Sequence, residues 1–174
     1  MALLFAVAAS APAQTTPPAP AELRKLDFLV GEWKGKGWMF DARGGRASEM
    51  SQSVKVRRAD DGSSLRVKDV RTMKTPNVAP GGSPSYSSAP TDATVYYDDA
   101  AGLFRWRRDK DRRNPSELKI IGPQTVRWEQ RSETMALRVT VRVTEAGEWH
   151  ETLEFWSNQH GWLIAFESVL RRTK

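Results

Sequence analysis

The sequence contains no cysteine and only two histidines among its 174 residues. The missing cysteine excludes a thiolate nucleophile, a disulfide framework and a cysteine-type zinc site. Two histidines also exclude a metal site built from three. Acidic residues are in the minority, with 21 Asp and Glu against 27 Lys and Arg, so the formal charge is +6. The chemistry of any site must therefore come from carboxylates, cations, amides, hydroxyls and aromatic rings.

The sequence also lacks an apolar run of the roughly 20 residues that a membrane-spanning helix needs. Its most apolar stretch, residues 1–13, ends in the small residues Ala11, Pro12 and Ala13. We predict that this stretch is a truncated signal peptide cleaved before Gln14, which implies a periplasmic or secreted protein. The alternative is a disordered Ala/Pro leader. Residues 14–20 form a Thr/Pro-rich linker, and residues 21–174 fit a single domain.

From Gly31 onward, apolar and polar residues alternate with the period of two that is typical of β-strands. Short turn sequences rich in Gly, Asp and Asn separate the alternating runs. These runs cover residues 32–40, 48–58, 64–71, 93–98, 103–108, 118–121, 125–132, 136–144, 148–157 and 162–171. The pattern predicts an all-β, antiparallel barrel of about ten strands, preceded by a short N-terminal helix over residues 21–28.

One connection is longer than the others. Residues 74–92 are rich in Pro, Gly and Ser, and a loop of this length is uncommon in a compact domain. We expect either a mobile flap over an opening of the barrel or a disordered insertion.

The alternation also divides each strand into two faces. Arg and Lys fall mostly on one face, so we expect the positive charge to coat the outside and the other face to form an apolar interior. In the closing hairpin, Gln159 and His160 are the expected central residues of the turn. This register pairs Phe155 with Ile164, Leu153 with Phe166, Glu151 with Ser168 and Trp149 with Leu170, on the inner side together with Trp162.

The expected interior is aromatic and aliphatic with few polar groups, which is typical of a ligand cavity. We predict that the ligand-binding residues are Gln52, Trp106, Trp128, Gln130, Glu151, Leu153, Phe155, Ile164, Phe166 and Ser168. Asp69 is a further candidate for the inner face. Glu151 is a possible acid, base or ligand anchor; alternatively it lies at the mouth and meets an Arg or water. A filled core whose polar groups satisfy one another is the alternative to a cavity.

The segment 28–37, FLVGEWKGKG, resembles the Gly-x-Trp first strand of calycin barrels, which include lipocalins and fatty-acid-binding proteins. The fuller pattern Leu-x-Gly-x-Trp-x-Gly-x-Gly is similar to nitrobindin-like proteins and to uncharacterised bacterial secreted domains. Residues 151–172 of this sequence also resemble the closing hairpin of those bacterial domains. The resemblance implies structural roles for Gly31, Trp33, Gly35 and Gly37. It also implies a late arginine stacked over Trp33, for which Arg171 or Arg172 is the candidate; we assign it to Arg171.

The resemblance fails at one point that bears on function. Nitrobindin-like proteins carry a haem-ligating histidine on the closing strand, and residues 162–171 contain none. His150 lies one strand earlier on the expected outer face and would ligate haem only if that assignment were wrong. His160 lies in a turn. We therefore predict no metal and no resident cofactor, with haem as the alternative.

These observations favour non-enzymatic binding or carriage of a small hydrophobic or aromatic molecule. The alternatives are a haem barrel that handles reactive nitrogen or oxygen species and an interaction domain with a filled core. Neither histidine has an evident Ser or Asp partner, so we assign no catalytic residue. The basic run 105–113 is interrupted by Asp109 and Asp111, which argues against nucleic-acid binding and leaves a weak, salt-sensitive attraction to anionic surfaces.

Overall fold

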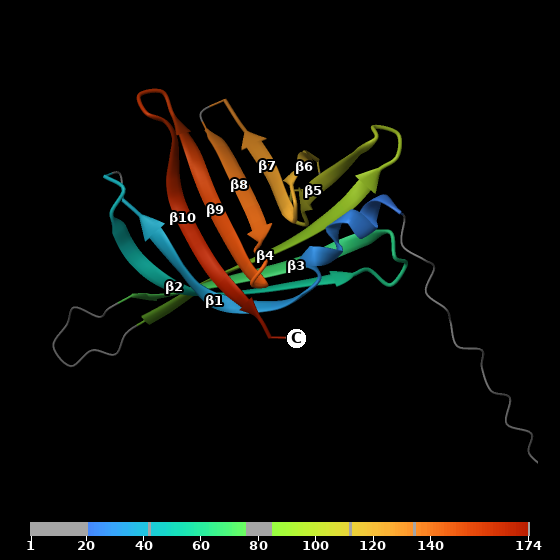
Figure 1. The fold of residues 1–174 in the computed structure, drawn as a ribbon. Helices are drawn as coiled ribbons and strands as arrows, with labels where there is room; N and C mark the ends of the chain where they lie inside the picture. Colours follow the sequence, from blue (N-terminus) through green and yellow to red (C-terminus); the bar gives the residue numbers. More distant parts are fainter. Residues whose placement is uncertain (1–20, 42, 76–84, 112, 134, 174) are drawn as a thin grey trace, which may run out of the picture.

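The computed structural model describes residues 21–41, 43–75, 85–111, 113–133 and 135–173, so the predicted signal peptide and linker lie outside the described residues. Within these ranges the chain forms one 3-10 helix and ten strands (Figure 1). The elements are η1 (Glu22–Leu29), β1 (Gly31–Phe40), β2 (Arg46–Arg58), β3 (Ser64–Thr75), β4 (Ser85–Asp98), β5 (Leu103–Arg108), β6 (Ser116–Gly122), β7 (Thr125–Arg131), β8 (Ala136–Val143), β9 (Glu148–Ser157) and β10 (Gly161–Arg172).

The strands form a closed antiparallel barrel in which each strand pairs with its neighbours in sequence. Pairing of β1 with β10 closes the sheet, so that Trp33 lies opposite Arg172 and Gly37 opposite Ser168. The predicted fold class is confirmed, including the number of strands and the short N-terminal helix. No helix among the described ranges is long and apolar enough to cross a membrane.

The β3–β4 hairpin extends further than its composition indicates. β3 continues to Thr75 and β4 begins at Ser85, with Lys74 opposite Tyr86, whereas we expected an irregular connection over residues 74–92. Pro90 lies within β4 opposite Val70. Residues rich in Ser and Pro disfavour strands by propensity alone, so only pairing with β3 explains the regular structure here. Residues 76–84 lie outside the described part of the chain.

Helix η1 packs against β4 and carries a row of buried leucines. Leu23, Leu26 and Leu29 are all buried in the core, as expected for a helix that plugs one end of the barrel. The indole nitrogen of Trp33 donates a 3.0 Å hydrogen bond to the carbonyl oxygen of Leu29, which ties the helix to the first strand. Trp33 in turn packs against Trp149, with 5.5 Å between the ring centroids. The polar atom of a buried indole is thereby satisfied within the plug.

The arginine above Trp33 is Arg172, so the assignment to Arg171 was wrong. The Arg172 guanidinium lies 4.3 Å from the Trp33 ring centroid and donates hydrogen bonds to the carbonyl oxygens of Val30 and Phe28. The side chain of Arg171 is 83% exposed and pairs with Glu148. Successive residues of a strand point to opposite faces, so two adjacent arginines cannot both reach the same ring.

Exchange of Arg172 for Ala is expected to lower the free energy of unfolding by about 1–2 kcal/mol, because it removes a cation–π contact and the hydrogen bonds to the η1–β1 connection. Arg171→Ala provides the matched control and should change this free energy by less than about 0.5 kcal/mol, as exposed ion pairs do. Urea unfolding of both variants measures the difference. Equal losses in the two variants would contradict the assignment.

Two glycines of β1 allow the close approach of β10. A Cβ at Gly35 would lie 2.1 Å from the carbonyl oxygen of Val169, which is far inside contact distance. At Gly37 the added atom would lie 2.5 Å from the Phe166 ring. Gly31, whose φ of +148° is unusual for other residues, begins the strand. The structural roles implied for these residues therefore correspond to specific steric needs.

The β9–β10 register is partly as predicted. Leu153 lies opposite Phe166, Glu151 opposite Ser168 and Trp149 opposite Leu170, all as predicted. The register shifts between Ile164 and Phe166, so Phe155 lies opposite Leu163 and the predicted Phe155–Ile164 pair was wrong.

A bulged residue reverses the faces of all residues beyond it. Ile164 is consequently 41% exposed on the outer wall, and Trp162, also assigned to the interior, lies beneath the guanidinium of outward-facing Arg138.

Candidate functional site

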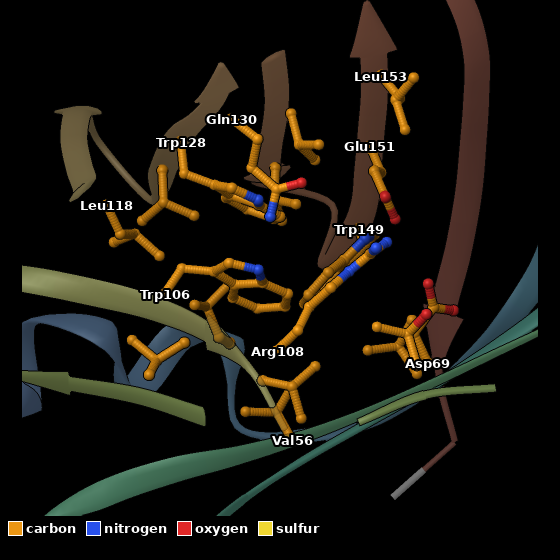
Figure 2. A pocket seen from close by; sticks show the side chains of 18 of the residues that line it. Val56, Asp69, Trp106, Arg108, Leu118, Trp128, Gln130, Trp149, Glu151 and Leu153 are labelled. Atoms are coloured by element: carbon orange, nitrogen blue, oxygen red, sulfur yellow. The ribbon is translucent and has the colours of Figure 1, made fainter. Parts of the chain in front are cut away.

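A cavity of about 260 Å³ lies inside the barrel. Residues of η1 and of strands β2 to β9 contribute to its wall, so the lining draws on almost the whole sheet. Figure 2 shows Leu118, Trp106 and Trp128 on one side and Asp69 and Glu151 on the other, with Leu153 next to Glu151. Trp149 and Arg108 lie between them. The cavity therefore has an apolar end and a charged end.

The apolar end is built around two stacked indoles. The rings of Trp106 on β5 and Trp128 on β7 lie 4.4 Å apart between centroids and are inclined by 21°. Strand β6 separates their strands, and Leu118 on β6 pairs with Trp128. Leu118 also faces the cavity. Because all three side chains share the inward phase of their strands, the large rings meet over β6 and form a flat aromatic wall.

The charged end is a closed ring of four hydrogen bonds. The amide nitrogen of Gln52 donates to Asp69 Oδ1 at 2.9 Å and to Glu151 Oε2 at 3.0 Å. The guanidinium of Arg71 donates to Asp69 Oδ2 at 2.9 Å and to Glu151 Oε1 at 2.6 Å. Each donor thus bridges both carboxylates, and each carboxylate oxygen receives one donor. We call Gln52, Asp69, Arg71 and Glu151 the polar ring.

The polar ring is largely buried, although the Arg71 side chain remains 25% exposed. The side chain of Glu151 is 6% exposed, and the Arg71 guanidinium lies 4.3 Å from the Phe166 ring centroid. Burial, and then the negative charge of Glu151, raise the pKa of Asp69 to about 6. Burial lowers the pKa of Arg71, but the two carboxylates outweigh this effect and raise it, so the guanidinium stays charged. At neutral pH the ring holds two carboxylates against one cation.

Asp69 is expected to make the stability depend on pH. Its pKa is raised from 3.8 to about 6, so the folded chain binds this proton more tightly than the unfolded chain does. The resulting stabilisation is complete below about pH 4 and is lost as the pH rises to about 6, by at most ~3 kcal/mol. The amide in Asp69→Asn does not titrate, so this variant should lack that component.

Urea unfolding of the wild type and Asp69→Asn between pH 4 and 7 measures the component as the difference between two curves. Asp99→Asn, which changes an exposed carboxylate outside the barrel, should keep the wild-type slope. A constant difference between wild type and Asp69→Asn across this pH range would contradict the raised pKa.

The structure brings most of the predicted binding residues to the interior. Trp106, Trp128, Gln130, Glu151 and Leu153 line the cavity. Gln52, Phe166 and Ser168 are buried but are not among the residues that line the cavity. Phe155 lies opposite Leu137, a lining residue, without lining the cavity itself. Ile164 faces outward because of the bulge described above.

Sequence reasoning missed two cavity-lining arginines, Arg71 and Arg108. We expected arginines on the outer face, and the charge of these two concealed their position. The signal was the alternation itself: Arg71 follows Leu65, Val67 and Asp69 in the inward phase, and Arg108 follows Phe104 and Trp106. Glu151 meets an arginine, as its alternative interpretation held, although deep within the barrel rather than in bulk solvent.

The histidines do not lie where a haem ligand is needed. His150 lies opposite Arg142 and Val169, with its Nε2 3.4 Å from Glu148, and it does not line the cavity. His160 lies in the exposed β9–β10 turn. Within the described ranges, moreover, no group of three or more His, Asp or Glu residues is arranged to hold a metal ion. The cavity-facing residues therefore do not fit a histidine-ligated haem.

The sequence matches no protein-family profile, and no curated protein sequence matches it. Among solved structures, the S-type phycobiliprotein lyase CpeS from Guillardia theta aligns with a TM-score of 0.59 and 12% identity, over 88% of this chain and 93% of that one. A protein of unknown function from the DUF3598 family of Nostoc punctiforme aligns with a TM-score of 0.56 and 11% identity. That alignment covers 90% of this chain and 50% of the other, so this chain spans half its length.

Rv2717c from M. tuberculosis aligns with a TM-score of 0.49 and 16% identity, over 90% of this chain and 99% of that one. Identities this low show the fold alone. The phycobiliprotein lyase and the DUF3598 protein thus share the fold of this chain, which is a closed antiparallel barrel.

Proposed function

We propose that this protein binds a small, mainly hydrophobic or aromatic molecule inside the barrel and carries or senses it without chemical conversion. The observation that carries the proposal is the 260 Å³ cavity, with its stacked Trp106 and Trp128 wall and its polar ring. Ligand sites in proteins have this character: they are concave and mostly apolar, with a few polar groups that orient the ligand. The likeness to the phycobiliprotein lyase supports a ligand-binding barrel at the level of the fold.

The binding energy would come mainly from apolar burial. Each Å² of apolar surface removed from water contributes roughly 25 cal/mol, so a ligand that buries about 200 Å² against this wall gains about 5 kcal/mol before the costs of association. The wall is built from the rigid sheet, with both indoles already stacked on each other. Little ordering entropy is therefore spent on the protein side.

The two other functions considered for this chain fit the structure less well. A filled core does not leave a cavity of this size, and a haem barrel needs an inward ligand that the histidines do not supply. The oxygens of Glu151 accept hydrogen bonds from Gln52 and Arg71, which hold this carboxylate in a fixed orientation suited to anchoring a ligand. A periplasmic or secreted location, proposed from residues 1–13, suits a carrier that meets its ligand outside the cytoplasm.

Native mass spectrometry of the purified protein tests whether a small molecule co-purifies, and fluorescence titration with N-phenyl-1-naphthylamine tests binding directly. Val139→Phe fills part of the cavity, because Val139 is inward on β8, and should weaken probe binding at least about tenfold, or about 1.4 kcal/mol. Thr140→Phe is the matched control, since the next residue faces outward, where its hydroxyl accepts a hydrogen bond from Arg127. Absent or equal probe binding in all three proteins would overturn the proposal.

A further inference from the structure

The polar ring carries an excess of negative charge that faces the cavity. Two carboxylates, Asp69 and Glu151, share a single guanidinium from Arg71, and the fourth member, Gln52, is neutral. Asp69, Arg71 and Glu151 all line the cavity. With every group ionised the ring itself has a net charge of −1, and most of the other residues that line the cavity are apolar.

An uncompensated charge in such a place is costly, because the interior solvates it far less well than water does. The protein relieves this cost partly by holding a proton on Asp69 more tightly, which is why the pKa of that carboxyl is raised. A bound cation would relieve the same cost without protonation. The ring is therefore electrostatically complementary to a positively charged group within the cavity.

The hydrogen-bonding capacity of the ring also favours a positively charged group. Each carboxylate oxygen accepts one hydrogen bond within the ring and can accept another. The Oε1 atom of Gln52 is buried and has no hydrogen-bond partner in the described part of the chain. The cavity-facing carboxylates of Asp69 and Glu151 thus keep capacity to accept further hydrogen bonds, which suits an ammonium group with its three N–H donors and no acceptor.

We infer that the ligand is an arylalkylamine, with its flat apolar body against Trp106 and Trp128 and its protonated nitrogen at Asp69 and Glu151. This inference rests on the proposed ligand-binding function and specifies the class of ligand. Figure 2 shows the two ends on opposite sides of the cavity, so a molecule with one apolar and one basic end can contact both.

Two features of the cavity would instead favour a ligand that carries a hydrogen-bond acceptor or a negative charge. Arg108 lines it, is largely exposed and has no ion pair with any described residue. The indole nitrogen of Trp149 is buried without a hydrogen-bond partner in the same part of the chain. The polar ring outweighs them because its charges are screened least, whereas water solvates Arg108. A carboxylate probe tests whether the polar ring or these two donors determine the preferred charge of the ligand.

The test compares three probes of the same size by isothermal titration calorimetry at pH 8, where Asp69 is ionised: 2-naphthylmethylamine, 2-naphthylmethanol and 2-naphthoate. The amine is expected to bind at least about tenfold more tightly than the neutral alcohol, and the carboxylate more weakly than either. Amine binding that is no tighter than alcohol binding overturns the inference, and so does a preference for the carboxylate.

Two variants then locate the preference. Glu151→Gln should reduce the affinity for the amine about tenfold and leave the affinity for the alcohol within about twofold. Glu167→Gln is the matched control, since that carboxylate lies on the adjacent strand opposite Thr152 and outside the cavity. An amine preference that survives Glu151→Gln unchanged also overturns the assignment. If Glu151→Gln does not fold, the comparison of probes on the wild type still decides the ligand class.

The same experiment separates the two levels of the argument. If none of the three probes binds and no molecule co-purifies, the ligand-binding function itself fails. If the alcohol binds as tightly as the amine, the ligand-binding function stands and the inference about the amine fails.

Discussion

The close approach of β1 and β10 is the contact on which the rest of the structure depends. At Gly35 there is no room for even one carbon atom between the strands. Only when these strands pair does the sheet become a wall with an inside, and only then can Gln52 of β2 reach Glu151 of β9, 99 residues further along the chain. The polar ring is a direct product of barrel closure, as is the enclosed space beside it.

The interior shows how simple alternation produces a site with two different ends. The inward phase of β5 and β7 carries indoles, and the inward phase of β3 and β9 carries charged side chains. Neither end needs an irregular loop or a special backbone conformation, because alternate residues of each strand point to the inside. Since Asp69 and Glu151 sit on regular strands, their separation is set by the sheet rather than by mobile segments. Burial of Asp69, and then the negative charge of Glu151 beside it, account for the raised pKa of Asp69.

The fold was predictable from the sequence because a period of two, sustained over ten runs, has few solutions. Predictions of individual side-chain positions were wrong where another physical effect was stronger than the alternation. The bulge beside Ile164 changes the phase within one strand, and nothing in the local sequence marks it. Arg172, not Arg171, reaches Trp33, since the choice between neighbours depends on register with β1. Arg71 and Arg108 were missed because we gave charge more weight than phase, whereas partners on other strands accommodate Arg71 within the barrel.

The order of pairing has a consequence for how the chain acquires an interior during synthesis. Nine of the strand pairs join sequence neighbours, whereas the pair of β1 with β10 joins opposite ends of the domain. A nascent chain that has emerged from the ribosome up to β9 can form a curved, open sheet. Its apolar inner face is then uncovered between β1 and β9, where β10 is missing. Until β10 emerges, two unpaired edges remain exposed, and such edges recruit other chains. A truncation within β10 should consequently show itself as aggregation before it shows itself as lost affinity.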